Sequence, residues 1–106
     1  MNSSFACDLS ALTDDQRQRH RELATLLRPA VVEFNELPNG YAANFRSNMD
    51  LEIAEFCSLE LRCCPFFTLE LSQNESTSVL TITGSGDIKP FIRAEFGIPG
   101  SEAPDA

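Results

Sequence analysis

Apolar residues recur every three to four positions in the first third of the chain, directly after a polar start. Thr13 and Gln16 have the spacing of a capping box, in which each side chain bonds the other residue's backbone N–H at a helix N-terminus. Three leucines then follow at helical spacing: Leu23, Leu26 and Leu27. The pattern predicts a helix from about residue 13 to residue 28, where Pro29 ends it.

Alternation with a period near two predicts four strands, at residues 31–37, 41–45, 67–71 and 79–83. In the first of these, Val32 and Phe34 are expected to share one face. Asn39-Gly40 lies between the first two strands, and this dipeptide is a strong signal for a tight hairpin.

A nearly continuous apolar run over residues 49–63 predicts a second helix, with Asn48 or Asp50 as its N-cap. Few positions in it are polar, so we expect it to be the central and most buried helix. Pro65 ends it, because a residue that precedes proline is pushed out of the helical region. A short third helix is expected between Asp87, as its cap, and Gly97.

The order helix, hairpin, helix, hairpin, helix predicts an α+β fold. We expect one domain over residues 1–98, with a four-stranded antiparallel sheet and the helices packed mainly on one face. Within it, residues 1–11 are expected to form an irregular arm. The acidic tail at residues 99–106 is expected to be disordered.

The net charge of the chain argues against some classes of binding partner. The 106 residues include 16 acidic and 8 basic side chains, which gives a net charge of −8. Such a balance argues against binding to nucleic acid or to an anionic membrane surface. No membrane-length apolar run and no signal-peptide pattern is present, so a cytoplasmic location is expected. In that compartment the four cysteines are expected to be thiols rather than disulfides.

The cysteines divide into two groups. Cys57 lies roughly 9–10 Å along the helix axis from the vicinal pair Cys63-Cys64, too far to share a metal ion with it. Cys57 is therefore expected to be a small core residue. Cys63-Cys64, at the end of the helix before Pro65, is the candidate site.

A soft metal ion is the first hypothesis for this pair, because the ion itself stabilises thiolate. Zinc, or another thiophilic ion, is the expected cofactor. Cys7 in the arm and His20 on the apolar edge of the first helix are the expected further ligands, which makes the ligand set Cys7, Cys63, Cys64 and His20. Glu60, one turn before the pair, is a weaker oxygen ligand.

Two other functions stay open at this point. One is a non-catalytic interaction domain with structural cysteines, whose partner is another protein or a second copy of the chain. The other is a thiol redox protein, which is disfavoured because the negative end of the helix dipole opposes thiolate formation at Cys63 and Cys64. No residue is assigned a catalytic role, so a binding protein is favoured over an enzyme.

The stretch from Phe56 to Phe67 resembles a family of small bacterial proteins that have no established activity. In these proteins an apolar helix ends in a Glu-X-Arg-Cys-Cys-Pro-Phe motif, here Glu60 to Phe66. The likeness extends over most of the chain, at residues 7–9, 19–20, 37–41 and 80–84. The resemblance implies a shared fold and a candidate site at the cysteine pair, and it implies no catalytic residue.

Overall fold

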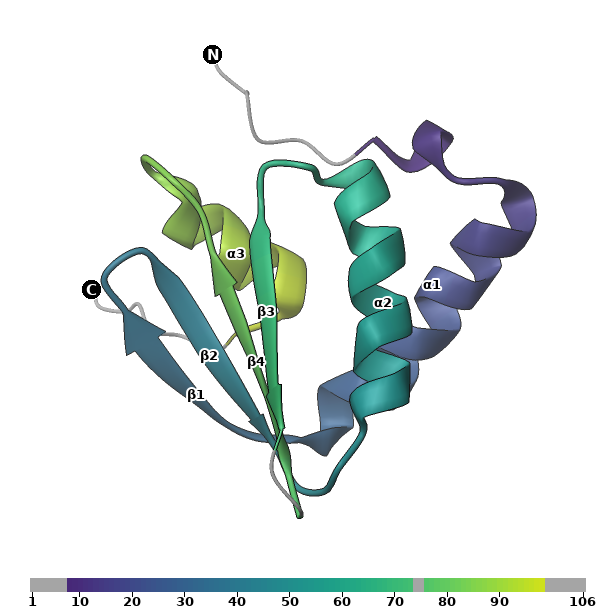
Figure 1. The fold of residues 1–106 in the computed structure, drawn as a ribbon. Helices are drawn as coiled ribbons and strands as arrows, with labels where there is room; N and C mark the ends of the chain where they lie inside the picture. Colours follow the sequence, from purple (N-terminus) through teal and green to yellow (C-terminus); the bar gives the residue numbers. More distant parts are fainter. Residues whose placement is uncertain (1–7, 74–75, 99–106) are drawn as a thin grey trace.

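A computed structural model describes residues 8–73 and 76–98 of the chain. It contains three helices and four strands in the expected order (Figure 1). The elements are α1 (Asp14–Leu27), β1 (Val31–Leu37), β2 (Gly40–Phe45), α2 (Asp50–Cys63), β3 (Thr68–Gln73), β4 (Ser78–Thr83) and α3 (Ile88–Phe96). The predicted α+β fold is confirmed.

The four strands form one antiparallel sheet in the order β1-β2-β4-β3. The first hairpin is present, but Asn39-Gly40 is not its two-residue loop. Leu37 pairs with Gly40, so the loop consists of Pro38 and Asn39, and Gly40 already belongs to β2. A Cβ atom on Gly40 would lie 1.9 Å from the carbonyl oxygen of Ile82. This glycine is therefore needed for the close approach of β2 to β4.

Strand β1 contains an irregularity that the alternation did not predict. The pairing register with β2 shifts between Val31 and Glu33, which is typical of a β-bulge. Val31 and Phe34 are half-buried, whereas Val32 is 63% exposed. The expectation that Val32 and Phe34 share one face is therefore wrong, because the extra residue changes the alternation.

The buried face of the sheet packs against the helices. Tyr41, Ala43, Leu80 and Ile82 supply the sheet side of this core. Helices α1 and α2 lie side by side, and both face the same interior as α3 (Figure 1). On α1, the capping box between Thr13 and Gln16 is present, with hydrogen bonds of 2.9 and 3.1 Å.

Helix α2 is less buried than its apolar sequence predicts. Ile53, Phe56, Leu59 and Cys63 are buried, but Leu51 and Leu61 are exposed. The helix is thus amphipathic in its packing, with one face toward the core and one toward solvent.

The two ends of α2 are held by distant parts of the chain. Its N-cap position is Met49, which makes no side-chain cap bond, but the side chain of the expected cap Asn48 accepts a hydrogen bond from the Asp50 N–H (3.2 Å). The hydroxyl of Ser78 on β4 also accepts a hydrogen bond from the Met49 N–H (3.0 Å) and donates one to Asp50 (2.6 Å). At the other end, the Asp8 N–H donates to the carbonyl oxygen of Cys63 (2.8 Å).

Helix α3 occupies the expected position. Asp87 is its N-cap residue but makes no side-chain cap bond, and Gly97 ends the helix in the left-handed conformation at φ 66°. In the described part of the expected arm, Leu9–Ala11 form a short 3-10 turn capped by Asp8, and residues 1–7 lie outside the described residues. The predicted tail at 99–106 lies outside the described residues. Within the described residues, no helix has the length and apolar character needed to cross a membrane.

Candidate metal site at the meeting point of three helices

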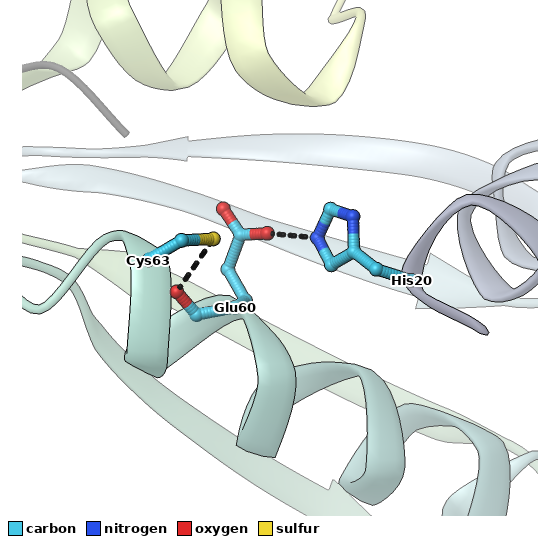
Figure 2. Close-up of side chains that lie close together, drawn as sticks. All are labelled: His20, Glu60 and Cys63. Carbon is cyan, nitrogen blue, oxygen red and sulfur yellow. Dashed lines mark hydrogen bonds and ion pairs between the residues drawn. The ribbon is translucent and has the colours of Figure 1, made fainter. Parts of the chain in front are cut away.

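Helix α2 presents Glu60 and Cys63 on its buried face. They are three residues apart, which places both side chains on the same side of a helix, one turn from each other. Glu60 is completely buried, and Cys63 is only 1% exposed. In Figure 2 the Cys63 sulfur lies beside the Glu60 carboxylate, 3.5 Å from the Glu60 carbonyl oxygen.

Helix α1 supplies His20 from the opposite side of the same carboxylate (Figure 2). Its Nε2 lies 2.7 Å from Oε1 of Glu60, and its ring stacks on Phe56 with the centroids 5.0 Å apart. His20 shares an inward stripe with Leu23 and Leu27, which are buried at i+3 and i+7. The predicted position on the apolar edge of α1 is therefore confirmed.

Two states of the imidazole are chemically distinct here. With the proton on Nε2, His20 donates a hydrogen bond to Glu60. With the proton on Nδ1, the Nε2 lone pair faces the carboxylate, and both groups can then bind one cation.

Cys64 lies one residue beyond the end of α2. Its backbone N–H still donates to the Glu60 carbonyl oxygen (2.7 Å), but its φ and ψ of −130° and 70° have left the helical region. The change of direction before Pro65 brings its sulfur to 3.9 Å from that of Cys63. Both sulfurs of the vicinal pair are thus buried and adjacent.

The oxidation states of the two neighbours differ. Cys64 is disulfide-bonded, whereas Cys63 and Cys57 are free thiols. The expectation that all the cysteines are thiols is therefore wrong for Cys64. That expectation rested on the compartment alone, and it did not foresee that Asp8 lies beside the pair, where its N–H donates to the Cys63 carbonyl oxygen.

One oxygen of the buried carboxylate has no hydrogen bond. Among the described residues, Oε2 of Glu60 has no hydrogen-bond partner within normal geometry. A buried polar atom without a partner is costly and needs an explanation. Two arrangements would satisfy this oxygen: a bound cation, or a proton shared between Glu60 and a second acidic group.

Glu95 of α3 is the second acidic group. Burial, then the charge of Glu60, and then the hydrogen bond that forms between the two carboxyl groups once one of them is protonated, raise the pKa of Glu95 to about 7. Burial and the charge of Glu60 also raise the pKa of the Cys63 thiol to about 11. The charged forms of Glu95 and Cys63 are therefore disfavoured unless a cation compensates them.

The donor atoms are spaced for such a cation after small shifts. Within each of two overlapping groups they lie within 4.8 Å of one another: His20, Glu60 and Cys63, and Glu60, Cys64 and Glu95. In a tetrahedral zinc site with bonds of about 2.0–2.3 Å, ligand atoms are about 3.3–3.8 Å apart. Changes of at most about 1.5 Å in these separations would thus close either group around an ion.

Three of the four predicted ligands, His20, Cys63 and Cys64, are brought to this place. The fourth, Cys7, lies outside the described residues. Cys57 takes part in neither group and is half-buried against the core, in agreement with its exclusion. Burial raises its pKa to about 11, as expected for a packing cysteine.

Sequence reasoning underestimated Glu60 and missed Glu95. Both carry a signal that was available in the sequence. Glu60 stands four residues after Phe56 and three before Cys63, and Glu95 stands three residues after Ile92 on α3. A carboxylate in phase with the apolar stripe of a helix is expected to face the core.

A cavity of about 120 Å³ extends from this cluster toward the sheet. His20 and Glu95 line it together with apolar side chains that include Ala24, Phe56 and Phe96. The cavity therefore adjoins the cluster on the side of His20 and Glu95.

No family model, curated protein or solved structure matches the chain. The resemblance to the family with the Cys-Cys-Pro-Phe motif therefore stays a prediction.

Proposed function

We propose that this protein binds one thiophilic metal ion, zinc or an ion of similar preference, between its three helices. His20, Glu60 and Cys63 form the primary ligand set, with Glu95 and a reduced Cys64 at its edge. An imidazole nitrogen, a carboxylate oxygen and a thiolate sulfur are the three donor types that zinc takes in proteins.

The observation that carries the proposal is the unpaired Oε2 of the fully buried Glu60. Its carboxylate has His20 on one side and the Cys63 sulfur on the other (Figure 2). A cation at this point would satisfy the free oxygen, stabilise the Cys63 thiolate and offset the charge of the carboxylates.

A proton shared between Glu60 and Glu95 is the competing explanation, since the pKa of Glu95 is raised to about 7. The two explanations differ in what the cluster needs. Proton sharing uses only the two carboxylates, whereas a metal site also uses His20 and Cys63. The positions of the donors also indicate what a bound ion would do. An ion held by residues of α1 and α2 would link these two helices in the core.

Native mass spectrometry of the reduced protein with one equivalent of Zn²⁺ tests the proposal. We expect a complex with one zinc ion, and isothermal titration should give an affinity that falls at least about tenfold in Glu60→Gln. Glu60→Gln keeps the shape of the side chain and removes its charge.

Glu55→Gln is the matched control. Glu55 lies on the same helix, but it is exposed and pairs with Arg19. This variant should bind zinc like the unmodified protein. Absence of a zinc complex in the reduced protein, or equal affinities for the two glutamine variants, would show that the cluster is not a metal site.

A further inference from the structure

The disulfide at Cys64 lies directly beside the proposed ligands. Cys64 is completely buried, and its sulfur is 3.9 Å from the free thiol of Cys63. Two thiolates on one zinc ion, at bond lengths of about 2.3 Å, have sulfurs about 3.8 Å apart. The backbone therefore already holds the vicinal sulfurs at the separation that a shared ion requires.

A disulfide sulfur cannot take part in such a site, because the metal ligand is the thiolate. While Cys64 is oxidised, the cluster offers one sulfur, that of Cys63. After reduction it offers two sulfurs next to the same carboxylate, since Glu60 belongs to both groups of donor atoms.

We propose that the oxidation state of Cys64 controls metal binding, with the disulfide form as the weak-binding state and the dithiol form as the tight-binding state. This inference rests on the proposed function, because it concerns the same site. It assigns Cys64 the role of a redox-controlled ligand.

The chemical step requires a dithiol reductant. One thiolate of the reductant attacks a sulfur of the disulfide, and the other cysteine sulfur leaves as a thiolate. The second thiol of the reductant then attacks the mixed disulfide, releases the remaining cysteine and closes the reductant's own disulfide. Two electrons pass to the protein, and the two released sulfurs take up protons until an incoming cation displaces them.

Titration with Co²⁺ before and after treatment with dithiothreitol, which is removed before the metal is added, tests this inference. Co²⁺ occupies zinc sites, and its sulfur-to-metal absorption grows with the number of coordinated thiolates. We expect this absorption per bound ion to double on reduction. The affinity should rise at least about tenfold, since loss of an outer-shell partner alone costs about 10–100-fold.

Cys64→Ser should bind as the oxidised protein does and should no longer respond to the reductant. Cys57→Ser is the matched control, since Cys57 is on α2 but outside both donor groups, and it should respond like the unmodified protein. Cys7→Ser tests whether the remaining cysteine of the chain supplies the second sulfur of the disulfide.

The outcomes separate the two proposals. Cobalt binding with equal absorption in both states would overturn the redox inference and leave the metal site standing. Absence of binding in both states would overturn both. If reduction unfolds the metal-free protein, recovery of the circular dichroism spectrum on adding Co²⁺ supports the inference, and failure to recover contradicts it.

Discussion

Two pairs of polar side chains join the same helices, α1 and α2, from adjacent positions on α1. Arg19 makes two hydrogen bonds of 2.8 Å to Glu55, and both side chains are nearly half exposed. His20 makes one contact of 2.7 Å to Glu60, where the side chains are 14% and 0% exposed. In the outer pair, Arg19 and Glu55, opposite charges meet in contact with solvent. In the inner pair, His20 and Glu60, one carboxylate oxygen has no hydrogen-bond partner in the described part of the core.

The difference separates two uses of a carboxylate. Arg19 lowers the pKa of Glu55, chiefly through their hydrogen bonds, so the ionised form of this carboxylate is stabilised. An exposed pair of this kind contributes little to stability. Glu60 loses its hydration in the core, and with both carboxylates ionised its one hydrogen bond there is the contact with His20. Its charge therefore requires compensation, by a cation or by a proton shared with Glu95.

The largest expected effect is on the inner pair. His20→Ala, studied with a chelator present, should lower the free energy of unfolding by about 3 kcal/mol, because it leaves the Glu60 carboxylate buried without its one partner. Urea denaturation followed by circular dichroism measures this value. His20→Gln, which keeps a donor, should lose less, and a loss in His20→Ala below about 1 kcal/mol would contradict the account.

Glu60→Leu should change stability and zinc binding in different ways. It removes the buried carboxylate together with its desolvation cost, and the remaining His20 is 14% exposed and keeps access to solvent, so the metal-free protein should be unchanged or more stable by about 1–2 kcal/mol. The same variant should lose its bound zinc in native mass spectrometry. A variant that is both less stable and still loaded with zinc would assign Glu60 a purely structural role.

The smallest effect is expected at the outer pair. Glu55→Gln should leave zinc binding unchanged and should shift the urea midpoint only slightly, because the side chains remain solvated. That slight shift should vanish in about 1 M salt, where the Debye length is about 3 Å. A salt-insensitive shift as large as that of His20→Ala would remove the distinction between the two pairs.

Much of the fold is predictable because local signals agree with the final packing. The capping box at Thr13, the stop at Pro65 and the left-handed Gly97 each act within a few residues. The errors occur where a distant segment decides the structure. Ser78 on β4 bonds the Met49 N–H at the start of α2, in addition to the local bond of Asn48 to Asp50. The close approach of β4 likewise requires glycine at position 40.

The candidate site divides in the same way. The vicinal cysteines and the inward position of His20 follow from helix periodicity and from the proline. The pairing of His20 with Glu60, and the approach of Glu95, depend on how three helices converge, which no local pattern specifies. The disulfide of Cys64 likewise depends on contacts across the fold rather than on the motif.

The contacts at the two ends of α2 also restrain its rotation about its own axis. One residue of slippage in an α-helix turns each side chain by about 100°, enough to carry a core-facing group to the solvent side. The Ser78 hydroxyl at one end and the Asp8 N–H at the other fix the angular setting of the helix. These contacts therefore help to keep Glu60 and Cys63 facing the core. Removing the contact at either end should disorder the side chains of the candidate site before the protein unfolds.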